Sequence, residues 1–442
     1  MDINILKETL QKAGITGAGG AGFPAYAKLN TTADTLILNC AECEPLLKLH
    51  RQLLEEDADT ILSALSEICK ITGIKEFVIG IKHSYKNALE SVNAEIGSYK
   101  NARVHILDEI YPSGDEVVLT YNVTKRIVPP GGIPIDVGVV VYNVETVLNI
   151  YNALNENKGV THKYVTVAGE VKNPLTLKVP IGTKFSQLLE ICGGKTIEDT
   201  AIIQGGPMTG KLSSESQTVS KTTNAVLVLP KEHCLISNRT RKTTISIKQA
   251  MSTCCQCKTC TEMCPRNLLG HPISPSDFMK SLTSLNADTN ALLNTMYCSQ
   301  CGVCEAYACP QGLSPATLIG IYKDGLRKNS IRPQKLEAPK SVRPEREYRQ
   351  LPMYRLENRL DVLQYDKPAP LSDITIKPKK VKIALSQSIG APSVPCIKKG
   401  DKVNAGDMIA TPAENALSIA LHASIDGVVT DVTDSFIVIS SK

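Results

Sequence analysis

Nine of the fifteen cysteines lie between residues 254 and 309, and their spacing constrains what this part of the chain can fold around. They include two runs, Cys254-x2-Cys257-x2-Cys260-x3-Cys264-Pro265 and Cys298-x2-Cys301-x2-Cys304-x4-Cys309-Pro310. Each run places three thiolates on one short turn, and a four-iron cluster takes its fourth ligand from farther along the chain. The sequence therefore predicts two [4Fe-4S] clusters.

The first run matches the bacterial ferredoxin pattern, and the second differs from it by one residue before its last cysteine. In two-cluster ferredoxins, each run gives its last cysteine to the other cluster. We therefore expect one cluster to be held by Cys254, Cys257, Cys260 and Cys309, and the other by Cys298, Cys301, Cys304 and Cys264.

Two zinc sites or a set of disulfides are the alternatives for these cysteines. Zinc sites usually pair two CxxC units and need neither a third step nor a trailing Cys-Pro. Disulfides need an oxidising compartment, which nothing else in the sequence indicates. Cys255 breaks the spacing and is expected to be a bystander.

Composition indicates a multidomain globular protein. At about 150 residues per domain, the 442 residues suggest about three domains. Aromatic residues make up 4% and tryptophan is absent, so we expect no stacking surface for nucleic acid. The basic residues of segment 327–349 are expected to be solvated. We expect neither a secretory signal nor a membrane span, and a cytoplasmic location.

The N-terminal part alternates between helical and strand patterns. Helices are expected at 3–13, 51–69 and 84–97, and strands at 35–39, 76–81 and 103–107. This alternation predicts a three-layer α/β domain. The glycine-rich segment 14–24 lets backbone N–H groups approach a phosphate or a flat ring, although a flexible turn is an alternative.

Four segments of this domain resemble the flavin- and NADH-binding subunit of respiratory complex I. They are Gly17-x-Gly19-Gly20-Ala21-Gly22-Phe23-Pro24 with Lys28, Asn39-x-x-Glu42-x-Glu44-Pro45, Tyr111-x-x-Gly114-Asp115-Glu116, and Asn143-x-x-Thr146. The sequence departs from the family pattern at Ala41 and Cys43. The resemblance implies that FMN is lined by Gly17, Gly19, Lys28, Asn39, Glu42, Glu44, Tyr111, Gly114, Glu116, Asn143 and Thr146. It places Gly20, Phe23 and Glu44 toward NADH.

The remainder of the chain predicts three more domains. Strand and turn patterns after residue 160 resemble a β-grasp (SLBB) domain, whose loop at 205–208 is either structural or ligand-binding. The cysteine runs lie in helical patterning. The C-terminal part resembles a barrel-sandwich hybrid of the lipoyl type, but Asp426 occupies the hairpin position of the carrier lysine, so we expect no covalent cofactor there.

The expected fold is thus multidomain α/β and α+β. Its parts are a flavin α/β domain (1–155), a β-grasp domain (160–232), an α-helical ferredoxin domain (244–330), a linker (331–372) and a barrel-sandwich domain (373–442). In the RnfC family the barrel-sandwich domain precedes the flavin domain. The order found here resembles the cobalamin reductases of propanediol utilisation.

That resemblance implies an oxidoreductase that passes electrons from NADH through FMN and two clusters to cobalamin. It further implies cobalamin or a cobalamin-processing adenosyltransferase as partner, a microcompartment shell protein nearby, and a location inside a bacterial microcompartment. One alternative is an RnfC-like subunit that delivers NADH electrons to another reductase or to ferredoxin. Another is a scaffold in which clusters only stabilise the fold, and it would contain no flavin.

Overall fold

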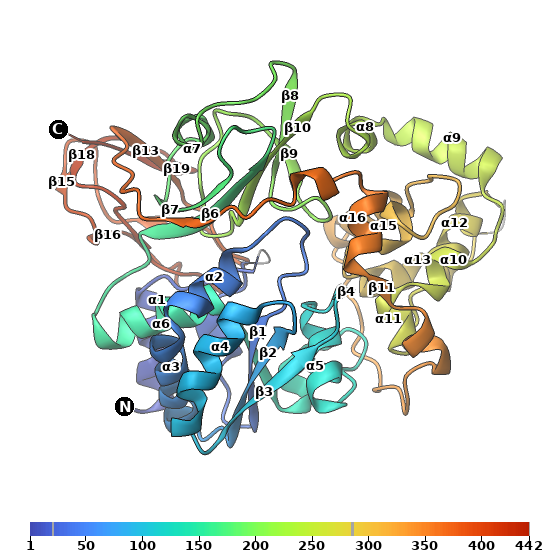
Figure 1. Ribbon diagram of the computed structural model, residues 1–442, viewed down its shortest axis with the longest axis horizontal. Helices are drawn as coiled ribbons and strands as arrows, with labels where there is room; N and C mark the ends of the chain where they lie inside the picture. Colours follow the sequence, from blue (N-terminus) through green and yellow to red (C-terminus); the bar gives the residue numbers. More distant parts are fainter. Residues whose placement is uncertain (20–21, 284–286, 442) are drawn as a thin grey trace.

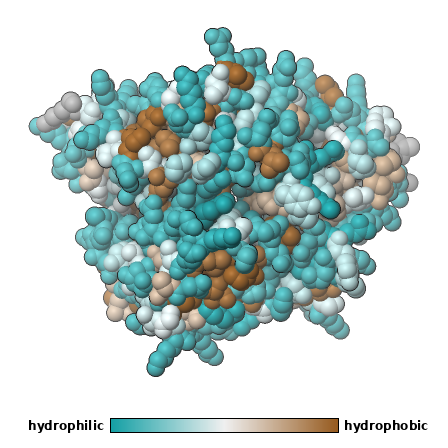
Figure 2. Space-filling view, viewed as in Figure 1, coloured by the Kyte–Doolittle hydropathy of each residue, from teal (hydrophilic) through white to brown (hydrophobic). Residues whose placement is uncertain are grey.

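The computed structural model describes residues 1–19, 22–283 and 287–441, which form four folded units (Figure 1). None of the helices in these residues is both long and apolar enough to cross a membrane. The face seen in Figure 2 is mostly hydrophilic, with apolar side chains in a few separate patches. The four units follow one another along the chain and are described in that order.

The N-terminal unit is built on a four-stranded parallel sheet with the order β3-β2-β1-β5. The strands are β1 (Thr35–Cys40), β2 (Glu76–Lys82), β3 (Ala102–Leu107) and β5 (Val139–Asn143). The chain adds β2 and β3 on one side of β1 and then returns to place β5 on the other side. The carboxyl ends of β1 and β5 therefore form a topological switch point, where open α/β sheets bind ligands.

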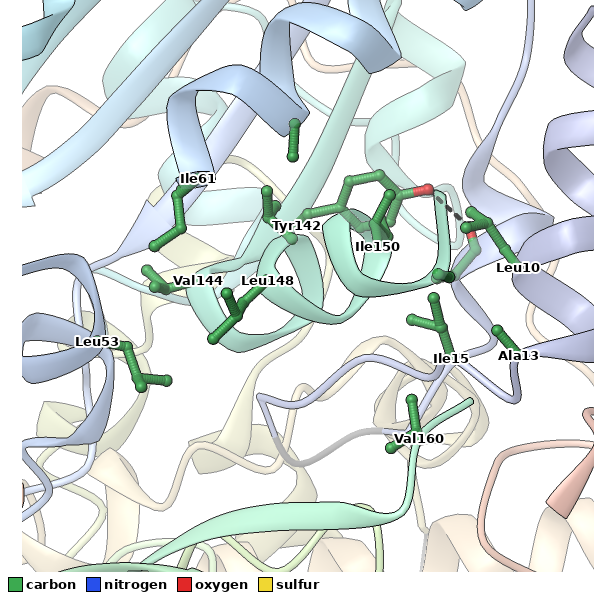
Figure 3. Packing of buried hydrophobic residues seen from close by; sticks show 14 of the residues in the cluster. Leu10, Ala13, Ile15, Leu53, Ile61, Tyr142, Val144, Leu148, Ile150 and Val160 are labelled. Atoms are coloured by element: carbon green, nitrogen blue, oxygen red, sulfur yellow. Dashed lines mark hydrogen bonds between the residues drawn. The ribbon is translucent and has the colours of Figure 1, made fainter. Parts of the chain in front are cut away.

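Helices cover both faces of this sheet, so the predicted three-layer arrangement is present (Figure 1). The helices are α1 (Ile3–Lys12), α2 (Leu49–Glu56), α3 (Ala58–Thr72), α4 (Lys86–Glu95), α5 (Glu116–Thr124) and α6 (Val144–Asn155), with 3-10 turns at Ala25–Lys28, Ile96–Ser98 and Pro134–Val137. Figure 3 shows aliphatic residues packed around α6 in the larger core. Within this core the Tyr142 hydroxyl donates to the Ala25 carbonyl over 2.7 Å.

The second unit is a six-stranded sheet with the order β12-β7-β6-β10-β8-β9. Its elements are β6 (His162–Gly169), β7 (Leu175–Pro180), α7 (Phe185–Ile191), β8 (Thr200–Gln204), β9 (Lys211–Ser213), β10 (Ala225–Pro230) and β12 (Leu371–Ser372). Lys163 on β6 forms a buried ion pair with Glu145 on α6. This pair fixes the second unit to the first.

The third unit is helical, as the patterning predicts, and carries both cysteine runs on its loops and short helices. Its helices are α8 (Cys234–Thr240), α9 (Thr243–Thr253), α10 (Thr259–Glu262), α11 (Pro265–Leu268), α12 (Pro275–Thr283), α13 (Thr289–Leu293), a 3-10 turn (Asn294–Tyr297), α14 (Val303–Ala306) and α15 (Pro315–Lys328). In Figure 1 it lies on the right, beside α5 and the short strand β4 (Ile110–Tyr111).

Residues 331–372, predicted to be a linker, are folded over much of their length. They contain 3-10 turns at Pro344–Tyr348 and Leu363–Tyr365, β11 (Leu351–Pro352), which pairs with β4, and α16 (Met353–Arg359). Leu351, Leu356 and Val362 are buried in a core shared with β4. Arg346, expected to be solvated, is buried and donates to Asn122. The prediction was wrong here because short apolar repeats lie between the charges of this segment.

The C-terminal unit is a pair of small antiparallel sheets that packs on the glycine-rich segment. The sheets comprise β13 (Lys380–Ala384), β19 (Phe436–Ser440), β18 (Gly427–Val432) and β15 (Lys402–Val403), and β14 (Val394–Pro395), β16 (Met408–Thr411) and β17 (Leu421–His422). The backbone N–H of Ile389 donates to the Gly22 carbonyl over 2.8 Å, and that of Ala420 donates to the Gln11 carbonyl over 3.0 Å. The C-terminal unit therefore contacts both α1 and the glycine-rich segment of the N-terminal unit.

Candidate functional site

A cavity of about 1,330 Å³ opens at the carboxyl ends of β1 and β5 and extends along the helical unit. Most residues that the resemblance assigns to FMN or NADH line it: Gly17, Gly19, Phe23, Lys28, Asn39, Glu44, Tyr111, Gly114, Glu116 and Asn143. Four segments far apart in the sequence therefore meet in one place. Gly20 lies outside the described residues.

Asn39 and Asn143 form the floor of this cavity, at the ends of neighbouring strands. They are direct register partners across β1 and β5. The Asn39 amide donates to the Gly114 carbonyl over 2.9 Å, and its oxygen accepts from the backbone N–H of Ala41 over 3.2 Å. The Asn39 amide at the switch point is thus fixed by the neighbouring turn.

Two glycines of the wall have no room for a side chain. A Cβ at Gly19 would lie 2.6 Å from the Asn143 amide nitrogen, and one at Gly114 would lie 2.6 Å from the Cys43 sulfur. That sulfur accepts from the backbone N–H of Gly114 at 2.6 Å. Burial raises the pKa of the Cys43 thiol to about 12, so it remains neutral. These close approaches hold the glycine segment and the turn against the strand ends.

Lys28 and Glu116 form an ion pair on the cavity wall. The Lys28 ammonium also donates to the Val141 carbonyl over 3.0 Å. Side-chain exposure is 15% for Lys28 and 39% for Glu116, so the lysine is the more buried partner. The positive charge predicted to face a phosphate is therefore shared with a carboxylate on α5.

Glu42 and Thr146 are buried behind the wall and are not among its lining residues. Glu42 accepts from the backbone N–H of His50 over 2.9 Å and pairs with Arg51, so it caps α2. The Thr146 hydroxyl accepts from the backbone N–H of Ala18 over 3.0 Å. Their predicted role in lining FMN stays a prediction. Both support the segments that form the wall.

Glu44 lines the cavity, and its carboxylate already accepts hydrogen bonds from a loop of the β-grasp unit. Its carboxylate accepts from the backbone N–H groups of Met208 over 2.9 Å and Thr209 over 2.7 Å. Burial raises the pKa of Glu44, and these hydrogen bonds oppose that rise. Arg239 holds the same loop from the other side by donating to the carbonyls of Pro207 and Gly210. Residues 207–210 of this loop line the cavity.

The two cysteine loops have the same backbone conformation. Gln256 and Gln300, which each precede the second cysteine of a run, have left-handed φ angles of 53° and 61°. Lys258 and Gly302, which follow it, have φ angles of 63° and 80°. Paired left-handed residues of this kind turn successive N–H groups inward, as at many iron–sulfur sites.

The cysteines lie near one another in two groups, and each group has the members of one crossed set that the motif predicts. Burial raises the pKa of the Cys260 thiol to about 12. The neighbouring thiols of Cys309, Cys257 and Cys254 also raise this pKa, which shows that the four lie close together. We call these four the surface-side set, because Cys257 is exposed. They line a small cavity of their own, of about 30 Å³.

The other four cysteines form the cavity-side set. Burial raises the pKa of the Cys304 thiol, and the neighbouring thiols of Cys298, Cys301 and Cys264 raise it further. Cys264 and Cys304 are buried, whereas Cys298 and Cys301 line the large cavity. In the described part of the chain, no three cysteine, histidine or acidic side chains converge closely enough for one metal ion. In a four-iron cluster, each thiolate binds a different iron atom.

Two contacts connect the cavity-side set to the predicted flavin segment at 111–116. The Tyr111 hydroxyl donates to the Cys301 carbonyl over 2.6 Å. Arg266, which follows Cys264 and Pro265, donates to both carboxylate oxygens of Asp115 at 2.9 Å. The segment at 111–116 therefore lines the cavity and also contacts the cavity-side set at Cys301 and next to Cys264.

Several residues of this region were not singled out from the sequence: Arg239, Arg266, Gln300 and Lys323. Arg266 could have been found from its position directly after Cys264-Pro265. Lys323 gives no such signal, because the helix α15 follows the last cysteine by several residues. Burial lowers the pKa of Lys323, and its ammonium donates to the Cys298 carbonyl.

Comparison with known families assigns each unit. Residues 10–152 match the Nuo51 FMN-binding domain, residues 164–212 the SLBB domain, residues 253–314 the 4Fe-4S dicluster domain and residues 364–442 the RnfC barrel sandwich hybrid domain. The predicted fold class is thereby confirmed.

Comparison with individual proteins gives a match over the whole chain. Cobalamin reductase PduS of Citrobacter freundii is 40% identical over 99% of this chain and 97% of its own length. The Salmonella typhimurium protein of the same name is 39% identical over 98% of this chain and 96% of its own length. The chain belongs to the cobalamin reductase PduS family. This family membership confirms the resemblance found in the sequence, and the matched domains make the chain a flavin and iron–sulfur electron-transfer oxidoreductase.

Other similar proteins cover the PduS-like chain only in part. One component of the Na⁺-translocating ferredoxin:NAD⁺ oxidoreductase complex of Acetobacterium woodii is 33% identical over 61% of this chain and 59% of its own length. Among solved structures, the NAD⁺-reducing [NiFe]-hydrogenase in its H₂-reduced state aligns with a TM-score of 0.49 and 18% identity, covering 75% of this chain and 64% of that chain.

Proposed function

We propose that this protein oxidises NADH and reduces cob(III)alamin or cob(II)alamin, using FMN in the large cavity and two [4Fe-4S] clusters in the two cysteine sets. When bound, FMN accepts the two electrons of a hydride and releases them one at a time, which suits clusters that carry single electrons. The observation that carries the proposal is the hydrogen bond from Tyr111 to Cys301, which joins the cavity wall to a cysteine set.

The cavity wall fits a flavin nucleotide. Gly19 and Gly114 line the cavity, and the lack of a side chain lets the glycine segment and the turn at 111–116 pack directly against Asn143 and Cys43 at the strand ends. Asn39 and Asn143 offer amide groups at the floor. Arg266 also lines the cavity, so its guanidinium adds positive charge to the wall next to Asp115. In this arrangement the ion pair between Lys28 and Glu116 holds the Lys28 ammonium in place beside the nucleotide phosphate.

The positions of the two cysteine sets give the order of the clusters. Cys298 and Cys301 line the large cavity, so the cavity-side cluster is next to the flavin. Cys257 of the surface-side set is exposed, so the surface-side cluster faces the outside of the protein. We therefore assign donation to cobalamin to the surface-side cluster. Cobalamin as acceptor rests on the printed name of the PduS relatives.

A second acceptor remains a specific alternative, because a component of a ferredoxin:NAD⁺ oxidoreductase complex is also similar to this chain. An anaerobic NADH titration followed by absorbance, with cob(III)alamin added at the end, distinguishes the two. We expect bleaching of flavin and cluster bands, and then reoxidation as cobalamin is reduced. Bleaching without reoxidation would assign another acceptor, and no bleaching at all would contradict NADH as donor.

A further inference from the structure

Lys323 places a buried positive charge beside the cavity-side set. Its side chain lies on α15, is 8% exposed, and donates from the ammonium to the carbonyl of Cys298. No ion pair among the described residues includes Lys323. Arg266, the other cation close to these cysteines, is by contrast paired with Asp115. Lys323 is therefore a cation whose charge is not neutralised by a bound carboxylate.

Gln300 adds two hydrogen bonds to the sulfur of the same cysteine. Its backbone N–H lies 3.3 Å from the Cys298 sulfur, and its side-chain amide nitrogen lies 3.2 Å from it. The amide fits against α15 because residue 320 is glycine: a Cβ there would lie 2.6 Å from the Gln300 side-chain oxygen. Gly320 and Lys323 are three residues apart and share one face of α15. One face of α15 therefore places the Lys323 ammonium at the Cys298 carbonyl and leaves room for the Gln300 amide at the Cys298 sulfur.

The surface-side set also has sulfur acceptors, because the Thr259 hydroxyl donates to Cys257 at 3.3 Å and the backbone N–H of Leu313 donates to Cys309 at 3.4 Å. Its environment differs at the counterparts of Gln300 and Cys298. Gln256 matches Gln300 in position and in φ angle, but its side chain is exposed. Within the described residues, no group donates to the Cys254 sulfur, the counterpart of Cys298, in any of the hydrogen bonds found. The main difference is in charge, because Lys323 is buried beside Cys298, whereas Lys258 in the surface-side loop is exposed. The two loops share a backbone but differ in the charge around them.

We infer that Lys323 and Gln300 raise the reduction potential of the cavity-side cluster, an inference that rests on the two-cluster function proposed above. A reduced cluster carries one more negative charge than an oxidised one. A nearby ammonium therefore stabilises the reduced form more, and burial strengthens this interaction because the surroundings screen charge poorly. Donors to the ligand sulfur act in the same direction.

A redox titration of the purified protein under anaerobic conditions, followed by electron paramagnetic resonance, tests this inference. In Lys323→Met we expect one of two midpoint potentials to move to a more negative value while the other stays unchanged. Gln300→Met should move the same midpoint in the same direction. Lys328→Met, which removes an exposed charge from the end of the same helix, should move neither. The shift should persist in a Cys257→Ala background, which leaves only the cavity-side cluster.

Unchanged midpoints in Lys323→Met and Gln300→Met, or equal shifts of both midpoints, would overturn the inference. If Lys323→Met fails to retain its iron, two other variants test the inference. Gln300→Met should still show the negative shift, and Lys323→Arg, which keeps the positive charge, should have the wild-type midpoint. Iron analysis of the wild-type protein keeps the two proposals apart. Fewer than two clusters there would contradict the proposed function, whereas two clusters without a selective shift would contradict only the inference about Lys323.

Discussion

The hydroxyl of Tyr111 donates a hydrogen bond to the carbonyl of Cys301 over 2.6 Å, and this contact joins two units that are 190 residues apart in sequence. Tyr111 is buried at the edge of the large cavity, and Cys301 lies on a loop with two left-handed residues. A loop of this kind has few backbone hydrogen bonds of its own. The tyrosine therefore fixes the distance between the proposed flavin site and the nearer cluster.

We expect Tyr111→Phe to destabilise the contact between these two units. The change removes the donor to the partly buried Cys301 carbonyl, which costs about 0.5–1.5 kcal/mol. The apparent melting temperature should fall, while flavin and iron content stay at wild-type levels. Tyr348→Phe is the matched control, because Tyr348 is 89% exposed. A melting temperature equal to that of the control would show that the hydrogen bond contributes nothing.

Lys28→Ala should weaken the retention of flavin. The change removes the ammonium and leaves Glu116 as an unpaired negative charge on the cavity wall, where a phosphate would bind. A loss of about 1.4 kcal/mol raises the dissociation constant tenfold. Flavin released on gel filtration and titrated back by fluorescence measures this constant.

Lys48→Ala is the control for this change. Lys48 has the same 15% side-chain exposure and also pairs with a carboxylate, Asp366, but it does not line the cavity. Equal flavin affinity in the two variants would contradict the role of Lys28, whereas a selective loss in Lys28→Ala would support it.

Cys257→Ala should remove one cluster and leave the other cluster and the flavin in place. Iron content should fall from about eight to about four atoms per chain, because each four-iron cluster needs all four thiolates. Cys255→Ala should keep both clusters, since Cys255 lies outside the repeated spacing although it is exposed in the same loop. Loss of flavin together with the cluster in Cys257→Ala would argue against separate sites.

Much of the fold follows from local patterns. The strand at 35–39 is found at Thr35–Cys40 and the helix at 84–97 at Lys86–Glu95, because long apolar runs and helical periodicity depend on few distant contacts. The cysteine sets were predictable for a similar reason, since the spacing within one run fixes three ligands. The crossing of Cys264 and Cys309 required knowledge of the motif.

The parts that could not be predicted depend on contacts between units. Glu44 belongs to a short motif of polar residues, yet its partners Met208 and Thr209 lie more than 160 residues away. Lys323 is one of many lysines in the sequence, and only the packing of α15 brings it to Cys298. The segment at 351–365 has apolar residues between its charges, but their burial depends on pairing with β4 in another unit.

Lys221 connects three units at the start of the glycine-rich segment, and its burial predicts a dependence on pH. Its ammonium donates to the Gly14 carbonyl over 2.6 Å and to the Ala420 carbonyl over 3.2 Å. Burial lowers the pKa of Lys221 from 10.5 to about 7. His422 is a titratable neighbour, and burial lowers its pKa to about 4, so this histidine stays neutral above pH 6.

The sign follows from the difference between the folded and unfolded states. Between pH 7 and 10.5 the unfolded lysine holds a proton that the folded lysine has lost, so the free energy of unfolding rises with pH by up to about 1.4 kcal/mol per unit. Below pH 7 both states are protonated and the cost of burying the charge is fully present. In Lys221→Met this contribution disappears.

We therefore expect the melting temperature of the wild type, relative to Lys221→Met, to rise between pH 6.5 and 8.5. Lys184→Met, which removes an exposed lysine of the same unit, should keep a constant offset from the wild type. A constant offset for Lys221→Met as well would show that Lys221 keeps its proton in the folded protein. Its two carbonyl contacts would then hold the charged form, and the support of the glycine-rich segment would not change with pH.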